Sequence, residues 1–268
     1  MRGKLYLVGT PIGNLGDVTF RALETLKNAD VIACEDTRRT LPFLAGFEIK
    51  KPLISYYKHK EKEGTERIKE LLNEGKNVAL VTDAGMPCIS DPGSVLVKEL
   101  FVEGYAFEVV PGPTAVASAA ALLGCENGFA FFGFLPEKKK EKKEVASEIK
   151  PLRRTALLYA APHDVNDVLD FLYEELGDRD VALVKEITKI HENVKKGRLA
   201  DLREENPRGE YVVAIEPAEK DQTTSEEEIK NRLEALISEG VDKKTAVKRV
   251  AEETGASKNV VYKLALDL

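Results

Sequence analysis

The sequence lacks several features that would assign it to common protein classes. It has no tryptophan and no apolar run approaching about 18 residues, so we expect no membrane-spanning helix. Its three cysteines, Cys34, Cys88 and Cys125, form no CxxC pair, which predicts no metal site and free thiols in a reducing cytosol. The opening MRGKLYLVGTP lacks the apolar segment and cleavage site of a signal peptide. These absences favour a cytoplasmic protein without a metal ion.

Two familiar nucleotide-binding motifs are also missing. GTPIGN, residues 9–14, has the wrong spacing for GxGxxG, and no GxxxxGK[ST] occurs. These two absences argue against a dinucleotide-dependent dehydrogenase and a P-loop nucleotidase. The net charge of −6 argues against a basic surface overall, so any contact with nucleic acid must come from local patches.

The chain does contain short apolar segments that alternate with helical patterns. In the first half we expect strands opening the segments 4–11, 30–40, 77–81 and 107–113, with helices at 18–29, 64–76, 94–104 and 114–124. Uniformly apolar strands between helices predict an α/β fold with a parallel sheet that is covered on both faces. In the second half we expect strands at 128–136, 155–162, 180–188 and 208–217 and a helix at 164–177.

The last fifty residues have a different pattern. Residues 220–228 are typical of a solvated linker, and 247–266 have the apolar spacing of a helix-turn-helix, with Gly255 at the turn. Its expected packing positions are Val250, Ala251, Val261 and Leu264. The predicted domains are therefore an α/β domain over 1–114, a second over 115–217 and a helical tail over 223–268.

Four of the expected strands in the first half end in loops rich in glycine and proline: GTPIGN, CEDTRR, TDAGMPCISDPG and PGPTA. Each loop alone is typical of an ordinary turn. In a parallel sheet, however, the carboxyl ends of the strands share one edge, which is where open α/β proteins bind ligands. Glycine there would let backbone N–H groups approach a ligand, and proline would fix the loop beforehand.

These motifs match a known family. LVGTPIGNLGDVTFRALETL, CEDTRRT, TDAGMPCISDPG and VVPGPTA resemble the tetrapyrrole-methylase superfamily and, within it, the ribosomal RNA small subunit methyltransferase I subfamily. The resemblance covers about residues 4–217 and extends into the tail. It implies two α/β domains with S-adenosylmethionine in the cleft between them, methylation of a cytidine ribose 2′-oxygen in small-subunit (16S) ribosomal RNA, and a homodimer.

The resemblance also implies a set of cofactor-binding positions. Tetrapyrrole-modifying relatives carry Gly-Gly-Asp where this chain has Val81, Thr82 and Asp83, and a methionine where it has Ala160. Backbone donors at the start of the helix 114–124 would bind the methionyl carboxylate. Asp83 would bond a ribose hydroxyl or balance the donor's positive charge, or would only form an Asx turn. The implied set is Pro11, Val81, Thr82, Asp83, Met86, Thr114, Ala115 and Ala160.

A ribose hydroxyl is a poor nucleophile, so its methylation needs a group that accepts the proton. Glu35 and Asp36 in CEDTRRT are candidates, and so is Lys185 if burial lowers its pKa, whereas Arg38 would hold a phosphate. The same charges are equally compatible with a structural network of ion pairs between the domains. The candidate catalytic set is Glu35, Asp36, Arg38, Lys185 and Glu186, with Arg39, Lys189, His191 and Glu192 in the same two segments.

Two basic segments are candidates for RNA contact. Residues 138–154 carry eight basic and three acidic residues, and the tail adds further basic residues. The first segment is also compatible with a solvated linker, and the tail with a helical cap or a dimer element. The candidate RNA-binding residues are Lys138, Lys139, Lys140, Lys142, Lys143, Arg153, Arg154, Lys248, Arg249, Lys258 and Lys263.

Two other functions stay open on the sequence alone. One is methylation of a tetrapyrrole small molecule, and the other is a ligand-sensing helix-turn-helix regulator. The basic segments and the tail favour RNA, because a tetrapyrrole requires neither. The carboxylate-rich loops favour an enzyme over a sensor.

Overall fold

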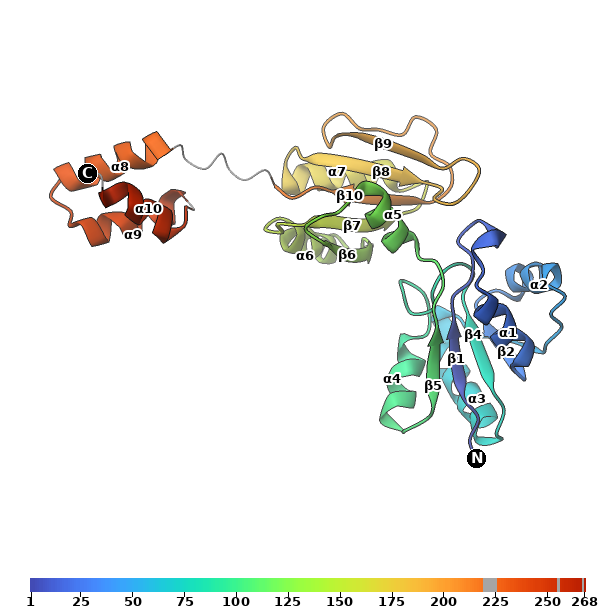
Figure 1. Cartoon of the computed structure of the whole chain (residues 1–268). Helices are drawn as coiled ribbons and strands as arrows, with labels where there is room; N and C mark the ends of the chain where they lie inside the picture. The colour runs from blue at the N-terminus through green and yellow to red at the C-terminus, as the bar shows by residue number, and fades with distance from the viewer. Residues whose placement is uncertain (219–225, 255, 267) are drawn as a thin grey trace. The chain divides into compact units, whose positions relative to one another are not determined.

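The chain separates into two compact units, Met1–Pro217 and Ala218–Leu268 (Figure 1). The computed structural model describes residues 1–218, 226–254, 256–266 and 268. The predicted turn residue Gly255 and residues 220–225 of the predicted linker therefore lie outside the described residues.

The first half of the larger unit is built on a five-stranded parallel sheet, as predicted. The strand order is β3-β2-β4-β1-β5, and every pair is parallel. The strands are β1 (Leu5–Val8), β2 (Val31–Cys34), β3 (Leu53–Ser55), β4 (Val78–Val81) and β5 (Phe107–Val110). The helices are α1 (Phe20–Asn28), α2 (Thr37–Gly46), α3 (Glu61–Asn73) and α4 (Ser94–Val102), with 3-10 turns η1 (Leu15–Asp17) and η2 (Lys58–Lys60).

Both faces of this sheet are buried. Leu80 packs with Leu72 of α3 and Leu96 of α4, whereas the next residue, Val81, packs on the other face with Leu26 of α1 and others. Successive strand residues point to opposite faces, so a strand covered on both sides must be apolar throughout. This requirement explains the uninterrupted apolar segments VIAC and VALV.

The second half of the larger unit forms a mixed sheet in the order β6-β7-β10-β8-β9. β6 and β7 are parallel, whereas β10 is antiparallel to both of its neighbours, and β8 and β9 are also antiparallel. The strands are β6 (Phe129–Phe134), β7 (Thr155–Ala160), β8 (Asp180–Lys185), β9 (Asn193–Arg198) and β10 (Tyr211–Ile215). The helices are α5 (Ala115–Leu123), α6 (Lys139–Ile149) and α7 (Val165–Leu176).

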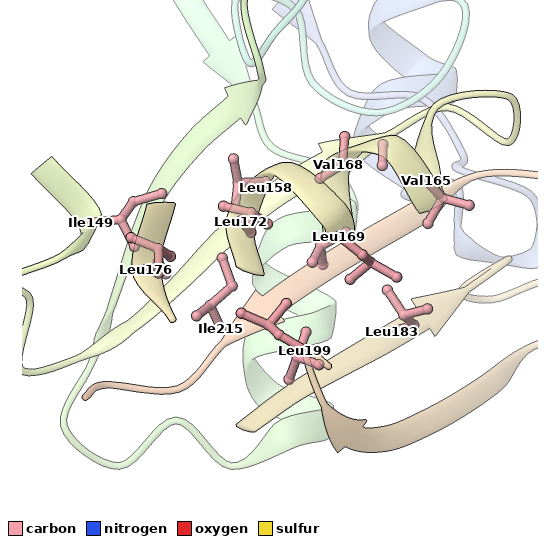
Figure 2. Close-up of a cluster of buried hydrophobic side chains, with 14 of the residues drawn as sticks. Ile149, Leu158, Val165, Val168, Leu169, Leu172, Leu176, Leu183, Leu199 and Ile215 are labelled. Carbon is pink, nitrogen blue, oxygen red and sulfur yellow. The ribbon is translucent and has the colours of Figure 1, made fainter. Parts of the chain in front are cut away.

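Helices cover both faces of the mixed sheet as well. On one face, Leu169 and Leu172 of α7 pack against Leu158 and Leu183 (Figure 2). On the other face, α5 packs its small apolar side chains against Leu157, Val184 and Val212. Ile12, from the loop after β1, belongs to this second core, so the first half contributes a side chain to the second.

Four elements were not expected from the sequence. Helix α2 contains Pro42, which favours a loop, but Asp36 caps its N-terminus by accepting a hydrogen bond from the Arg38 N–H at 2.8 Å. Helix α6 lies in the lysine-rich segment and buries only Ala146 and Ile149. The strands β3 and β9 are short or polar, and both lie at sheet edges, where strands need no apolar pattern.

The smaller unit contains α8 (Glu226–Ser238), α9 (Lys243–Thr254) and α10 (Lys258–Leu266). Its core includes the four expected packing residues, Val250, Ala251, Val261 and Leu264, together with Leu233 of α8. The helical tail is therefore confirmed as a unit with its own core. Across the described parts of the chain, no helix has both the length and the apolarity needed to cross a membrane.

Candidate functional site

The loops after β1, β2, β4 and β5 meet at one edge of the parallel sheet. Thr10 and Gly85 exchange two backbone hydrogen bonds, of 2.9 and 3.1 Å. The Gly112 N–H donates to Met86 Sδ at 3.2 Å, and the Asp36 N–H donates to Asp83 Oδ1 at 3.2 Å. These contacts join all four loops, as expected for loops at the carboxyl ends of parallel strands.

Gly9 and Gly112 allow two of these loops to touch. A Cβ on Gly112 would lie 2.9 Å from the backbone of Gly9, and a Cβ on Gly9 would lie 2.5 Å from Met86 Sδ. From the sequence, glycine in these loops was predicted to admit a ligand. At these two positions glycine instead admits a neighbouring loop.

Two adjoining cavities lie at this loop edge. The larger has a volume of about 380 Å³ and the smaller about 240 Å³, and they share Asp83 and Lys189 among other lining residues. The larger cavity is also lined by residues of the second half, including Tyr159, Glu210 and Val212. A cavity of this size, with apolar walls and a few polar groups, is typical of a small-ligand site.

The eight predicted cofactor-binding residues all line these cavities. The smaller cavity contains Pro11, Val81, Thr82 and Asp83, and the larger contains Asp83, Met86, Thr114, Ala115 and Ala160. These residues come from four separate segments of the chain, which the fold brings to one place.

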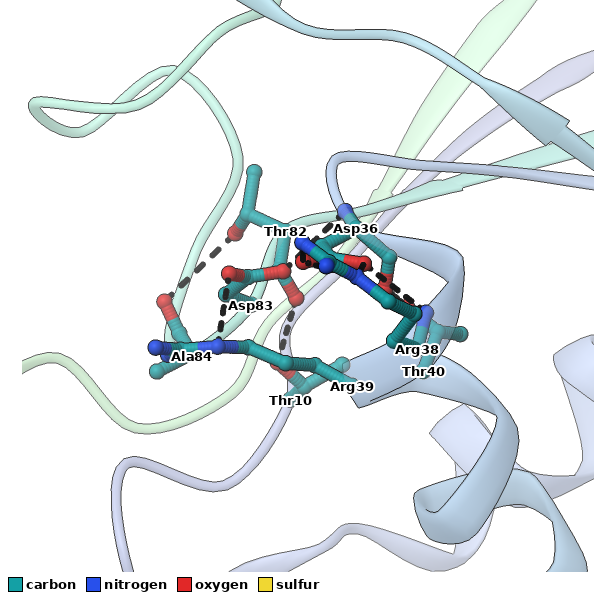
Figure 3. Close-up of polar contacts among 8 residues, drawn as sticks. All are labelled: Thr10, Asp36, Arg38, Arg39, Thr40, Thr82, Asp83 and Ala84. Carbon is teal, nitrogen blue, oxygen red and sulfur yellow. Dashed lines mark hydrogen bonds and ion pairs between the residues drawn. The ribbon is translucent and has the colours of Figure 1, made fainter.

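Asp83 is held by groups from the loop after β2 and from the first turn of α2 (Figure 3). Besides accepting from the Asp36 N–H, its carboxylate lies 3.4 Å from Arg39 Nε. Thr10 Oγ1 donates to the Thr82 carbonyl at 3.4 Å, which fixes the neighbouring backbone. Burial raises the pKa of Asp83, and the nearby Arg39 opposes that shift. Asp83 therefore has a fixed orientation before any ligand binds.

The start of α5 has fewer free donors than the sequence suggested. The Val116 N–H donates to the Tyr159 hydroxyl at 3.1 Å, and the Ala117 N–H donates to Thr114 Oγ1 at 3.4 Å. Among the first three N–H groups of this helix, the described contacts leave only that of Ala115 for a ligand. A carboxylate bound by several of these N–H groups would have to displace the Tyr159 hydroxyl or the Thr114 cap.

Of the five predicted catalytic residues, one lines either of these two cavities. That residue is Glu35, whose pKa is raised by burial and by the nearby Asp83. Asp36 caps α2 and pairs with Arg38 at 2.7 Å, which lowers the pKa of Asp36 to about 2. Such a low pKa makes Asp36 a weak proton acceptor. The Arg38 side chain is 87 % exposed, so its guanidinium is open to solvent although it is paired with Asp36.

Lys185 belongs to a cluster around the buried carboxylate of Glu204. Its Nζ lies 3.0 Å from Glu204 Oε2, and Glu204 also binds Lys195 and accepts from the Tyr211 hydroxyl at 2.9 Å. The hydrogen bond with Glu204 raises the pKa of Lys185, whereas a role as base requires a lowered pKa. The condition under which Lys185 was expected to accept a proton is therefore not met.

Glu186 also lies outside the two cavity linings and has a structural partner. It pairs with Lys189 at 2.7 Å and accepts from the Glu210 N–H at 2.9 Å. Lys189 also pairs with Glu210 at 3.1 Å. The alternative allowed by the sequence was a network between the domains, whereas these ion pairs lie within the second half. They present Lys189 and Glu210 to the cavities.

Several cavity residues were not assigned from the sequence. They include Asp91, Tyr159 and Glu210. Burial raises the pKa of Asp91 to about 7, and the carboxylates of Glu35, Asp83 and Glu210 add to the shift. Asp91 belongs to the SDPG segment of a loop that was predicted from the sequence to contact a ligand. Nothing in the sequence, however, predicts that Asp91 lines a cavity.

The predicted RNA-binding residues lie at the surface in two regions. On α6, Lys138 and Lys140 pair with glutamates of the same helix, and Lys143 pairs with Glu175 at 2.9 Å. Lys139, Lys142, Arg153 and Arg154 are not engaged by any of the described ion pairs, and all four are at least partly exposed. In the smaller unit, Lys248, Arg249, Lys258 and Lys263 are all exposed.

Comparison with known proteins agrees with the fold. Residues 4–203 match the family model of Tetrapyrrole (Corrin/Porphyrin) Methylases, and residues 223–268 match the RsmI C-terminal HTH domain. The uroporphyrin-III-C-methyltransferase of Thermus thermophilus superposes with a TM-score of 0.59 at 26 % identity, over 80 % of this chain and 94 % of that one. The family model and the fold thus define a methyltransferase of the tetrapyrrole methylase family.

Curated relatives define the branch of that family. Ribosomal RNA small subunit methyltransferase I of Bacillus subtilis is 40 % identical, over 97 % of this chain and 93 % of the relative. The protein of the same name from Thermotoga maritima is 42 % identical over 80 % of this chain and 98 % of its own length, so it is a shorter chain. The chain belongs to the ribosomal RNA small subunit methyltransferase I family.

Proposed function

We propose that this chain transfers the methyl group of S-adenosylmethionine to the 2′-oxygen of a cytidine ribose in 16S RNA of the small ribosomal subunit. The observation that supports this most is the near full-length likeness to ribosomal RNA small subunit methyltransferase I of Bacillus subtilis. The substrate is proposed from that relative, and the donor from the family and the cavity.

The residues of the larger cavity fit a methyl donor of this kind. S-adenosylmethionine supplies a methyl group on a positively charged sulfur. Four carboxylates line the cavity against two cationic side chains, a balance that favours a cation. Asp83 and the Ala115 N–H would bind polar groups of the donor, and apolar side chains such as Ile12 and Val212 would contact its adenine.

The exposed basic residues would bind the RNA backbone. Arg38 and Arg39 are 87 % and 69 % exposed, and they lie beside the cavity loops.

Replacing Lys258 and Lys263 with glutamine should weaken RNA binding and reduce the slope of log affinity against log salt by about 0.7 for each lost phosphate contact. Lys62→Gln, on the exposed surface of α3, is the matched control. Unchanged affinity and slope would count against a role for α10.

We also propose that the protein acts in the cytoplasm, where ribosomal subunits are assembled. We further propose that it forms a homodimer. Exposed apolar side chains on α4 and the edge strand β5 support the second proposal: Phe101 is 75 %, Val102 84 % and Val109 46 % exposed. Sedimentation of the purified protein tests it, because a monomer at micromolar concentration would contradict it.

The direct test of function uses unmodified small subunits and a labelled methyl donor. After incubation, the RNA is digested and the labelled nucleotide is identified by mass spectrometry. We expect one cytidine labelled on its ribose. Label on a base, or in a tetrapyrrole offered in parallel but not in RNA, would contradict the proposal.

A further inference from the structure

Lys189 lies where the two cavities of the site meet. The residues that line both cavities are Ile12, Arg39, Asp83, Ala84, Lys189 and Glu210. Methyl transfer joins two ligands, so their reacting atoms must meet at a wall that both ligands share. Arg39 and Lys189 are the two cations of this shared wall. Arg39 is 69 % exposed and lies beside Asp83, whereas the Lys189 side chain is 28 % exposed.

The turn that carries Lys189 has an unusual backbone. It follows β8, and two of its residues, Glu186 at φ 50° and Thr188 at φ 69°, are in the left-handed region although neither is glycine. The Lys189 N–H donates to the Glu186 carbonyl at 2.9 Å, and the Thr188 N–H donates to Glu192 Oε2 at 2.6 Å. Such conformations persist only where the surroundings enforce them, and they concentrate at functional sites.

The Lys189 side chain is held along its length. Its carbon chain passes over Gly13, at φ 153°, where an added Cβ would collide with Lys189 Cγ. Its Nζ lies 2.7 Å from Glu186 Oε1 and 3.1 Å from Glu210 Oε2. An ammonium group has three N–H donors, and the contacts among the described residues use two of them. One donor therefore remains for a ligand at the shared wall.

The charges around Lys189 favour a neutral ligand atom over an anion. Glu186 and Glu210 balance its positive charge, and Asp83 lines the same wall. These carboxylates would repel a phosphate, whereas a hydroxyl oxygen accepts a hydrogen bond without adding a charge. Burial acts to lower the pKa of Lys189, but its hydrogen bonds with Glu186 and Glu210 raise it overall. The group thus stays an ammonium, which can donate to an oxygen but cannot take its proton.

We propose that Lys189 binds the acceptor oxygen: its remaining N–H donates a hydrogen bond to the ribose 2′-oxygen that receives the methyl group. This inference rests on the proposed function. As the oxygen forms its bond to the methyl carbon, the carbon–sulfur bond breaks and its electron pair stays on the sulfur, which becomes a neutral thioether. The hydroxyl proton passes to water. Negative charge develops on the oxygen as the proton leaves, and a fixed donor there stabilises the transition state.

The first test is the single-turnover rate at which small subunits are methylated. Lys189→Met removes the charge and the donors, and the rate should fall by about 10²- to 10³-fold, the usual effect of removing one donor to a developing oxyanion. Lys189→Arg keeps the charge and should retain part of the rate. Lys69→Met, on α3, is the matched control, because Lys69 pairs with three glutamates and lies outside both cavity linings. It should methylate at the wild-type rate.

A second test separates contact with the acceptor from a structural role. It uses small subunits with 2′-deoxycytidine at the nucleotide mapped by the labelling experiment, which lack only the oxygen that Lys189 would bind. Without the methyl donor, the wild type should bind these subunits about tenfold more weakly than normal ones, because a hydrogen bond to a charged group is lost. Lys189→Met should bind both kinds of subunit equally. A lysine that only balances its two glutamates would leave the same ratio in both proteins.

The affinity of Lys189→Met for S-adenosylmethionine, measured by calorimetry, should be retained, because loss of a positive charge does not weaken the attraction of a sulfonium. The proposal is overturned if Lys189→Met keeps the wild-type rate, if it distinguishes the two kinds of subunit as the wild type does, or if it no longer binds the donor. A wild-type protein that methylates no RNA would instead refute the proposed function.

Discussion

Glu204 is one buried carboxylate that determines the role of its charged neighbours. It is 5 % exposed and binds Lys185, Lys195 and the Tyr211 hydroxyl. Burial acts to raise the pKa of Glu204, but the hydrogen bonds from these three groups lower it to about 2. Because Tyr211 also lines the larger cavity, this cluster supports the cavity wall rather than the chemistry.

Glu204→Gln should destabilise the protein by about 3 kcal/mol at pH 7, because it leaves two ammonium groups without their carboxylate. The folded pKa lies below the ordinary value of 4.5, so this stabilisation is present above that value and is lost as the pH falls toward 2. Urea unfolding at pH 7 and at pH 3 measures the difference. An equal loss of stability at both pH values would contradict the assignment.

Asp91→Asn should have the opposite effect on stability. The folded pKa of Asp91, about 7, lies above its ordinary value of 3.8, so the ionised side chain is less favourable in the folded protein. Its contribution to stability is present below 3.8 and is lost as the pH rises through 7. The melting temperature of Asp91→Asn should therefore exceed that of the wild type at pH 8 and equal it at pH 4. A lower melting temperature at pH 8 would indicate that Asp91 has a stabilising partner.

At the residue scale, the sequence located the cavity residues better than the charged ones. Pro11, Asp83 and Thr114 were implied by the family resemblance. The parallel sheet explains why they meet, because each follows a strand and those strand ends share one edge. The pairing of Lys185 with Glu204 could not be foreseen, because it depends on where a loop nineteen residues away folds back. The direction of Asp91 depends on backbone angles that the sequence does not specify.

At the element scale, the contact between the loops after β1 and β5 holds the site together. Gly112→Ala would place a Cβ 2.9 Å from the Gly9 backbone, which must then move. We expect a loss of about 1–3 kcal/mol in stability, the usual cost of overpacking, together with weaker binding of S-adenosylmethionine. Denaturation and calorimetry measure the two effects. Gly46→Ala, where a Cβ meets no atom within 4 Å, is the control, and equal behaviour of the two variants would contradict this account.

The elements themselves were predictable to the extent that burial determines their pattern. Strands such as β4 are covered on both faces and must be apolar, so they were found from the sequence. β9, with the sequence NVKKGR, pairs on one side only and has no such requirement. Helix α6 was missed for the same reason. It has only a narrow apolar face, and ion pairs with spacing i,i+3 and i,i+4 join its lysines to its glutamates.

At the scale of the whole molecule, the helical tail has its own core and forms a separate unit. A chain ending at Pro217 should therefore fold and bind S-adenosylmethionine with unchanged affinity. Its KM for small subunits should rise while kcat stays the same, because we expect the tail to bind RNA and not to take part in methyl transfer. Unchanged KM would refute that role for the tail.

The central claim is that four loops of the parallel sheet, together with the second sheet, form the binding site of a methyl donor. Calorimetric titration with S-adenosylmethionine tests it most directly, on the wild type and on Ala84→Leu, which places a larger side chain in the lining shared by both cavities. We predict one donor molecule bound per wild-type chain and at least tenfold weaker binding by Ala84→Leu. No binding by the wild type, or equal binding by both proteins, would contradict the account.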